Sequence, residues 1–305
     1  MMKVNKLTKS FGRHHVVDRL SFQLETGRCM ALLGPNGAGK TTTLRLMSGL
    51  LQPDSGTVHL EECPGDIRAH IGYLPQHPQF HGWMTGREFL LYAAGLSGLS
   101  KQEAGRQADW TLDRVGLKEF RNKRISRYSG GMKQRLGIAQ AIIHQPKVLL
   151  LDEPVSALDP IGRREVLDLM EELKKETILL YSTHILNDAE EVSDEILLMH
   201  EGKVIESGTI EEVKSRHQME KLTLKFSMDS ESWRDYVSTW PAVERVEIHK
   251  QTLHVYVTDS GAVRKKVLDE ASRDDWPLVH FEVGRPTLED LFIKAVKNHA
   301  VDHHL

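Results

Sequence analysis

A glycine-rich stretch, Gly34–Thr42, places the strongest constraint on how this chain can fold. It reads Gly-Pro-Asn-Gly-Ala-Gly-Lys-Thr-Thr and fits the P-loop pattern of glycine, any four residues, then Gly-Lys-Ser/Thr. Glycines allow the backbone to turn tightly and bring its N–H groups against phosphate oxygens. The Lys40 ammonium suits the outer phosphates, and the Thr41 hydroxyl suits Mg²⁺, which prefers oxygen ligands. The stretch therefore predicts a phosphate-binding loop.

The surroundings of the loop support this prediction over a chance match. The pattern alone would occur by chance in roughly one chain in a hundred of this length. Here an apolar run, Cys29–Leu33, enters the loop as a strand, and Thr41–Leu50 leaves it as a helix. Bound phosphates would then lie at a helix N-terminus, where free N–H groups and the helix dipole favour anions.

Two acids follow another apolar run, Val148–Leu151. In a P-loop protein such acids emerge beside the phosphates. Asp152 would then help to hold Mg²⁺, and Glu153 could orient or deprotonate the attacking water. An apolar strand that ends in two acids is common elsewhere, so the prediction depends on the P-loop upstream.

Three further features have both a functional and an ordinary interpretation. Ser129-Gly130-Gly131 precedes a helix and is either a second anion-binding device or a flexible cap. His184 follows the predicted strand Thr177–Tyr181, so it either faces the ligand crevice or lies on the surface. Phe11 either stacks on an adenine ring or packs in the ordinary way.

Strands alternate with helices around these motifs, which predicts an α/β domain with a mainly parallel sheet over residues 1–217. Residues 77–145 differ and are expected to form an all-helical subdomain. Two capping boxes, Thr85-x-x-Glu88 and Ser100-x-x-Glu103, open amphipathic helices there. A third helix is expected over about 131–144.

Past residue 217 the pattern restarts, and residues 218–305 are expected to form a second domain. Its strands and helices follow the order β-α-β-β-α-β, which fits a small α+β ferredoxin-like unit with one extra helix. The expected elements are strands 222–226, 243–249, 253–257 and 278–283, and helices 231–240, 262–272 and 288–298.

Composition excludes several classes of protein. The 305 residues carry a formal net charge of −3, so the basic bias of a nucleic-acid-binding protein is absent. Two cysteines provide no disulfide framework. No apolar run approaches the roughly 18 residues of a membrane span, so we expect any membrane role to come through a partner.

Together these motifs resemble one family, the nucleotide-binding subunits of ABC transporters, over about residues 1–215. Every family motif occurs in order. In chain order they are the A-loop aromatic Phe11, the Walker A loop Gly34–Thr42, the Q-loop Gln76, the signature Ser129-Gly130-Gly131, the Walker B pair Asp152-Glu153, the D-loop Ser156–Asp159 and the switch His184.

The resemblance implies ATP and Mg²⁺ as ligands and an ATPase site with named residues. Its catalytic residues would be Lys40, Glu153 and His184. Its Mg²⁺ site would comprise Thr41, Gln76 and Asp152. Its nucleotide-binding residues would be Phe11, Gly34, Asn36, Gly37, Gly39, Lys40, Thr41 and Thr42, with Ser129, Gly130 and Gly131 supplied by a second chain.

The same resemblance implies partners and a place in the cell. It predicts a homodimer or a paired nucleotide-binding subunit, a separate transmembrane permease and no nucleic acid. The chain would lie in the cytoplasm, on the inner face of the cell membrane, held there by the permease.

The sequence departs from the commonest signature, Leu-Ser-Gly-Gly-Gln, because Tyr128 and Met132 flank its core. Tyr128, together with Thr287–Phe292 near the end of the second domain, resembles the bacterial ABC-2 type exporters. Two alternatives remain at this stage: the ATPase of an importer, and a soluble ABC ATPase that acts on ribosomes or DNA. Contacts with the transported substrate are expected to lie in the membrane subunit.

Overall fold

The computed structural model describes residues 1–156, 158–216, 220–227 and 231–284, together with Leu288, Asp290 and Phe292. Contacts divide the chain into two units, Met1–Ile210 and Glu211–Leu305. The boundary that the sequence places between residues 217 and 218 remains a prediction.

A six-stranded sheet forms the centre of the first unit, with the order β5-β6-β7-β3-β8-β9. Its first five strands pair in parallel, and β9 runs antiparallel to β8. Strands β3, β6 and β7 are buried along their whole length, as expected of apolar runs covered on both faces. The strands are β3 (Cys29–Leu33), β5 (Ile71–Leu74), β6 (Val148–Asp152), β7 (Ile178–Thr183), β8 (Glu195–His200) and β9 (Lys203–Thr209).

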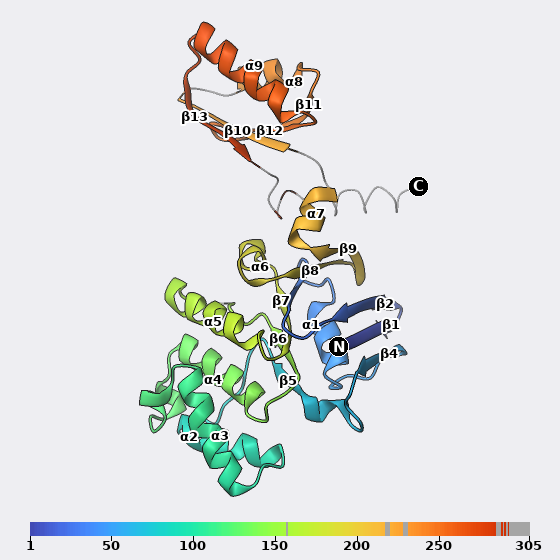
Figure 1. Ribbon diagram of the computed structural model, residues 1–305, viewed down its shortest axis with the longest axis vertical. Helices are drawn as coiled ribbons and strands as arrows, with labels where there is room; N and C mark the ends of the chain where they lie inside the picture. The colour runs from blue at the N-terminus through green and yellow to red at the C-terminus, as the bar shows by residue number, and fades with distance from the viewer. Residues whose placement is uncertain are drawn as a thin grey trace. The chain divides into compact units, whose positions relative to one another are not determined.

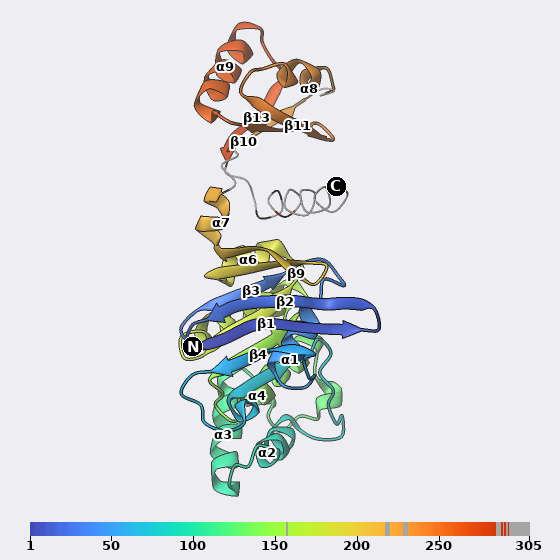
Figure 2. The same cartoon turned by 90° about the vertical axis from the view of Figure 1, so that its right-hand side faces the viewer.

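A second, antiparallel sheet has the order β2-β1-β4. Its strands are β1 (Met2–Phe11), β2 (His14–Leu24) and β4 (Ser55–Leu60). Helix α1 (Lys40–Met47) follows the P-loop and lies beside this antiparallel sheet (Figures 1 and 2). Its Leu44 and Met47 share one buried core with side chains from both sheets. Leu20 and Leu24 of β2 are buried and alternate with exposed neighbours, as in a strand with one buried face.

The helical subdomain contains α2 (Gly86–Leu96), α3 (Lys101–Arg114) and α4 (Gly130–Ile142), which lie together in Figure 1. Both predicted capping boxes are formed. In the first, the backbone N–H of Thr85 donates to the Glu88 carboxylate at 2.8 Å, and the Glu88 N–H donates to the Thr85 hydroxyl at 3.2 Å. Two short 3₁₀ helices, η2 (Lys118–Phe120) and η3 (Ile125–Arg127), lie between α3 and α4. Another, η1 (Ile67–His70), precedes β5 outside the subdomain.

Helices α5 (Pro160–Leu173) and α6 (Leu186–Val192) also belong to the first unit. Helix α7 (Ile210–Arg216) starts at the last residue of this unit and continues into the second. Asp159 caps α5 by accepting a hydrogen bond from the Gly162 N–H at 3.3 Å. Helix α6 was not predicted. A buried Asp188 on α6 accepts a hydrogen bond from Arg163 Nε of α5 at 2.7 Å, which ties the two helices together.

The second unit contains a four-stranded antiparallel sheet with the order β11-β12-β10-β13. This order confirms the ferredoxin-like topology. The rings of Trp233 and Trp276 lie with their centroids 4.5 Å apart and their planes tilted by 51°, and both contribute to the core of this unit. Most of the expected final helix lies outside the described residues. The elements are β10 (Glu220–Phe226), α8 (Glu231–Ser238), β11 (Val243–His249), β12 (Thr252–Val257), α9 (Ser260–Arg273) and β13 (Leu278–Gly284).

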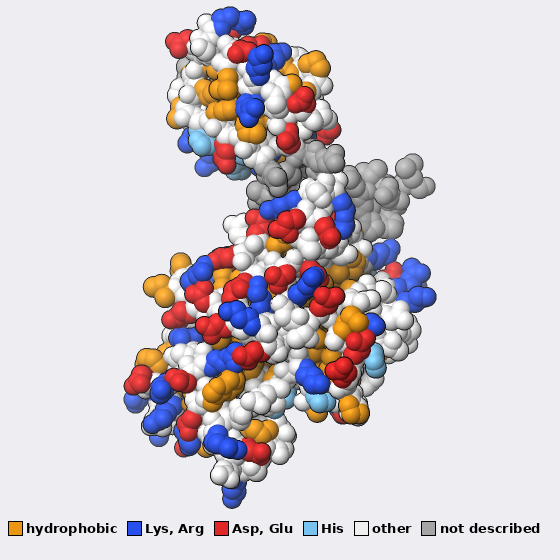
Figure 3. Space-filling view, viewed as in Figure 1, with side chains coloured by type: hydrophobic (Ala, Val, Ile, Leu, Met, Phe, Trp, Pro, Cys, Tyr) orange, Lys and Arg blue, Asp and Glu red, His pale blue; other side chains and the backbone are white. Residues whose placement is uncertain are grey.

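Charges of both signs are interspersed over the face of the first unit shown in Figure 3, in keeping with the mixed composition. Among the described residues, no helix is both long enough and apolar enough to pass through a bilayer.

Candidate functional site

The phosphate-binding loop connects the buried strand β3 to helix α1, as predicted. Two of its glycines could not be replaced without moving the backbone. Gly39 has φ +100°, and a Cβ there would lie 2.3 Å from the carbonyl oxygen of Val16. A Cβ at Gly34 would lie 2.4 Å from the carbonyl oxygen of Met199. These contacts are far inside van der Waals distance, so the loop is pressed against its neighbours and requires glycine at both positions.

Lys40 begins α1 and folds back over the loop. Its Nζ donates hydrogen bonds to the carbonyl oxygens of Gly34 at 2.7 Å and Pro35 at 3.1 Å, and only 6% of the residue is exposed. Burial lowers the pKa of Lys40, while the carboxylates of Glu153 and Asp152 act in the opposite direction. The ammonium is therefore held at the rim of the loop.

A cavity of about 350 Å³ adjoins the loop and brings together residues from distant parts of the chain. Gln76 comes after β5 and Glu153 after β6, so both lie beyond the carboxyl ends of parallel strands, where open α/β sheets bind ligands. The lining residues are Val16, Asn36, Gly37, Gly39, Lys40, Thr41, Thr42, Gln76 and Glu153.

Asp152 lies at the end of β6 and is 1% exposed. Its Oδ1 accepts hydrogen bonds from the Thr41 hydroxyl at 3.0 Å and from the Ser182 hydroxyl at 2.7 Å. Its Oδ2 is buried and has no hydrogen-bond partner in the described part of the chain. A buried carboxylate oxygen is costly to leave unpaired, and together with the Thr41 hydroxyl it forms an oxygen donor set that fits Mg²⁺.

Glu153 is nearly buried, and both of its carboxylate oxygens contact predicted site residues. Gln76 Nε2 donates to Oε2 at 3.1 Å, and His184 Nδ1 lies 3.2 Å from Oε1. The backbone of Glu153 adopts φ +48°, a left-handed conformation that residues other than glycine rarely occupy. His184 follows β7, and 47% of its side chain is exposed. Gln76, Glu153 and His184, which the sequence predicts as separate motifs, therefore contact one another through the Glu153 carboxylate.

Ser182 contacts both acids and was not predicted as a site residue. Its hydroxyl donates to Asp152 and accepts a hydrogen bond from the Glu153 N–H at 2.9 Å. The available signal was its place two residues before His184, in the strand that pairs with the one ending at Asp152.

Ser129 caps the N-terminus of α4 and accepts a hydrogen bond from the Met132 N–H at 3.2 Å. Ser129 and Gly130 are exposed, and Gly131 is half-buried. None of these three residues is among those that line the cavity beside the P-loop. The chain therefore presents its Ser-Gly-Gly turn on the surface and not in its own cavity.

The residues that depart from the commonest signature have structural contacts. Tyr128 is 5% exposed, and its hydroxyl donates to the carbonyl oxygen of Phe120 at 2.8 Å. A Cβ at Gly86 would lie 2.3 Å from the same hydroxyl oxygen, so Tyr128 packs against the start of α2. Burial raises the pKa of Tyr128, which keeps the phenol protonated as a donor. Met132 is largely buried, so its side chain packs in the subdomain.

The two remaining motifs lie at the edge of the site. Phe11 ends β1 and is 54% exposed, which contradicts the ordinary packing interpretation; its stacking on adenine remains a prediction. In the D-loop, the Ser156 hydroxyl donates to the carbonyl oxygen of Glu153 at 3.0 Å, and Asp159 caps α5. Ala157 lies outside the described residues.

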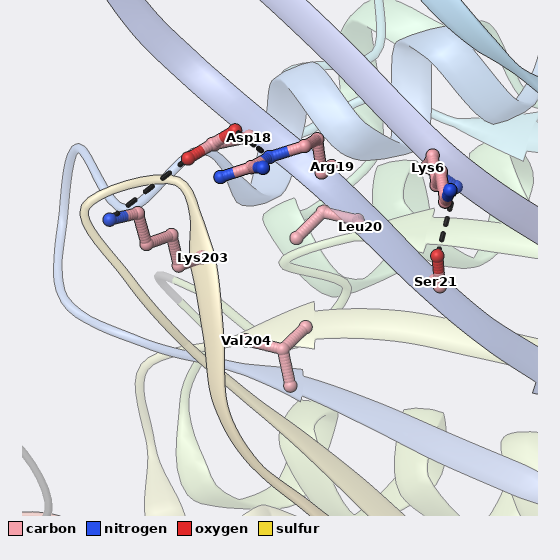
Figure 4. Close-up of a pocket in the computed structure, with 7 residues that line it drawn as sticks. All are labelled: Lys6, Asp18, Arg19, Leu20, Ser21, Lys203 and Val204. Carbon is pink, nitrogen blue, oxygen red and sulfur yellow. Dashed lines mark hydrogen bonds and ion pairs between the residues drawn. The ribbon is translucent and has the colours of Figure 1, made fainter.

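A second hollow of about 570 Å³ lies between β1, β2 and β9 and contains none of the predicted site residues (Figure 4). Asp18 pairs there with Arg19 at 3.1 Å and lies 4.0 Å from Lys203. The backbone N–H of Lys6 donates to the Ser21 hydroxyl at 2.9 Å. The acid of this hollow already has two cationic neighbours, and the hollow adds no chemistry to the site.

The parallel sheet, the glycine loop that opens into a helix and the acids at the adjacent strand end define a P-loop nucleoside triphosphatase. Residues 17–156 match the family model described as ABC transporter. Residues 208–296 match the model described as ATP-binding protein DrrA1-3-like, C-terminal domain.

Related proteins and structures agree with these matches. An ABC transporter ATP-binding protein of Bacillus subtilis (strain 168) is 44% identical, covering 97% of this chain and 99% of the relative. A Nod factor export ATP-binding protein of Paraburkholderia xenovorans (strain LB400) is 36% identical, covering 96% of each. A solved ATP-binding subunit of an ABC transporter superposes with a TM-score of 0.64 and 31% identity, covering 71% of this chain and 93% of that one. The chain belongs to the ATP-binding proteins of ABC transporters.

Proposed function

We propose that this chain is the ATP-hydrolysing subunit of an ABC exporter and works with a separate transmembrane permease. One observation carries the catalytic part: Lys40, Asp152, Glu153, Gln76 and His184 converge around the P-loop from separate elements. The export direction is supported by the relative named for Nod factor export and by the DrrA-like second domain.

Mg²⁺ is the cation that the site residues fit. Thr41, Gln76 and Asp152 would hold it through oxygen atoms, and the unpartnered Oδ2 of Asp152 gives the strongest support. When bound, Mg²⁺ would neutralise charge on the phosphate oxygens. All other steps can be assigned to side chains of this chain and its partner copy.

Glu153 is the proposed general base. Its carboxylate would accept a proton from the attacking water while the water oxygen bonds to the γ-phosphorus and the bond to the ADP oxygen breaks. Gln76 and His184 each contact one carboxylate oxygen, so they would hold Glu153 in the required orientation. Lys40 would move its ammonium from the loop carbonyls to the phosphate oxygens.

The proposed active unit is a head-to-tail dimer. The exposed Ser129-Gly130-Gly131 turn offers free N–H groups at a helix N-terminus, but it does not line the cavity of its own chain. In a symmetric pair, the turn of one copy would close the P-loop site of the other. Each site would then be complete only across the interface.

A mixing experiment tests this arrangement with two inactive variants, Lys40→Met and Ser129→Arg. In a mixed dimer, the intact Lys40 of one chain meets the intact Ser129 of the other, so we expect about a quarter of the wild-type sites to become active. The measurement is phosphate release after the two proteins are mixed in equal amounts.

The matched control mixes Lys40→Met with Glu153→Gln. Because both changes affect the same half of the site, the mixed dimer contains no intact site and should remain inactive. If the Lys40→Met and Ser129→Arg mixture also remained inactive while the mixed dimer formed, the turn would not act across the interface.

The proposed location is the inner face of the cell membrane, where the permease would hold the chain. We expect a tagged chain to co-purify with a multi-span membrane protein after mild detergent extraction. Inverted membrane vesicles that contain both proteins should then accumulate the transported compound when ATP is supplied outside. Loss of compound from loaded inverted vesicles would instead indicate import, and recovery of the chain on ribosomes or DNA would indicate a soluble ABC ATPase.

A further inference from the structure

We propose that Ser182 is a positioning residue that fixes the two acids of the ATPase site relative to each other. The inference rests on the proposed function, because it assigns Ser182 a role through Asp152 and Glu153. Ser182 belongs to none of the sequence motifs described above.

The register of the central sheet places Ser182 beside the acids. Strands β6 and β7 run in parallel, and Asp152 is the register partner of Ser182. Ser182 has an exposed fraction of 0%, so water cannot substitute for its hydrogen bonds without a rearrangement of the sheet. Its hydroxyl therefore acts from inside the protein, behind the cavity that adjoins the P-loop.

The Ser182 hydroxyl uses its donor and an acceptor position at the same time. It donates to Asp152 Oδ1 at 2.7 Å and accepts from the Glu153 N–H at 2.9 Å. The first bond fixes one carboxylate oxygen of Asp152 while the other is the buried oxygen without a described partner. A single oxygen atom thus links the side chain of one acid to the backbone of the next.

The bond from the Glu153 N–H to Ser182 helps to hold Glu153 in an unfavourable backbone conformation. Glu153 has φ +48°, and such conformations persist in residues other than glycine only where the surroundings hold them. The Glu153 N–H donates to the hydroxyl of Ser182, which lies in the fully buried strand β7. This conformation directs the Glu153 side chain to Gln76 and His184, so losing the bond should misplace the proposed base.

The test uses two variants of equal shape, Ser182→Thr and Ser182→Val. Both add the same bulk at the buried position, but only threonine retains a hydroxyl that can donate and accept. We expect the valine variant to have a kcat at least about tenfold below that of the threonine variant. The KM for ATP should agree within about threefold, because the loop and Lys40 are not altered.

Two measurements separate positioning from a general loss of stability. Binding of a fluorescent ATP analogue without Mg²⁺ should be equal in the two variants, because it reports the loop and not the acids. In a Glu153→Gln background, Ser182→Val should lower the residual turnover by less than about threefold relative to Ser182→Thr, because Ser182 acts largely through Glu153.

Thr177→Val provides the matched control. The Thr177 hydroxyl is also buried, but it donates to the carbonyl oxygen of Leu173 at 2.8 Å and contacts no site residue. This variant should have a lower Tm and an unchanged kcat. If Ser182→Val does not fold, the smaller change Ser182→Ala replaces it and is compared with the wild type.

Equal kcat values for the folded threonine and valine variants would overturn the inference, and so would a valine effect confined to Tm. The proposed function is tested separately by the wild-type chain and by Glu153→Gln. An active wild type that loses turnover on Glu153→Gln but not on Ser182→Val would refute the role of Ser182 alone. An inactive wild type in the presence of its permease would refute the proposed function itself.

Discussion

Replacement of Glu153 by glutamine is expected to lower ATP turnover by about 100- to 10,000-fold, the range typical for loss of a general base. Glutamine has nearly the same shape as glutamate, but its amide cannot take up the proton of the attacking water. ATP binding should survive, because Lys40 and the glycine loop are unchanged. The protein should therefore accumulate as an ATP-bound dimer, measured by size-exclusion chromatography with ATP and by single-turnover phosphate release.

Glu176→Gln is the matched control for this prediction. Glu176 is an exposed acid whose carboxylate pairs with Arg114 at 2.8 Å, and it takes no part in the site. The control should turn over ATP at the wild-type rate and form no additional dimer. Wild-type turnover in Glu153→Gln would remove Glu153 from the role of base, and failure of that variant to bind ATP would show that its effect arises elsewhere.

Replacement of Lys40 by methionine is expected to weaken ATP binding by about 1,000-fold. A charge pair at about 4 Å with an effective dielectric constant of about 20 is worth roughly 4 kcal/mol, and each 1.4 kcal/mol is about tenfold in affinity. Methionine keeps an unbranched apolar stem, so the helix that starts at this residue should still form. Titration with a fluorescent ATP analogue measures the loss.

Lys175→Met removes an exposed lysine from the turn after α5 and serves as the control, with no expected change in nucleotide affinity. A shift below about threefold in Lys40→Met would mean that the ammonium stays with the carbonyl oxygens of Gly34 and Pro35 when nucleotide binds. The mixing experiment would then need another variant to inactivate the P-loop side of the site.

The sequence was sufficient to predict most of the elements that carry the site. The P-loop, the strand that ends at Asp152 and both capping boxes have local signals, because glycine, apolar runs and Ser/Thr-x-x-Glu each act within a few residues. The order of elements in the second unit also predicted its ferredoxin-like sheet. Each of these features is determined by residues close together in the sequence, so it could be predicted without knowledge of the tertiary structure.

Other features depend on contacts between distant segments, so their local signals were weak or absent. Ser182 became visible only when the register of β7 against β6 placed it beside Asp152. Helix α6 is short, and the hydrogen bond from Arg163 to the buried Asp188 ties it to α5. The left-handed backbone of Glu153 is likewise set by tertiary contacts, since glutamate itself does not favour it.

The exposed turn at Ser129 also has a consequence for ATP consumption in the cell. In the proposed head-to-tail arrangement, a single copy would bind ATP in its P-loop but would lack the second surface that closes over the γ-phosphate. Unpaired copies would therefore keep ATP bound without hydrolysing it. Consumption would follow the number of assembled pairs and not the amount of this polypeptide.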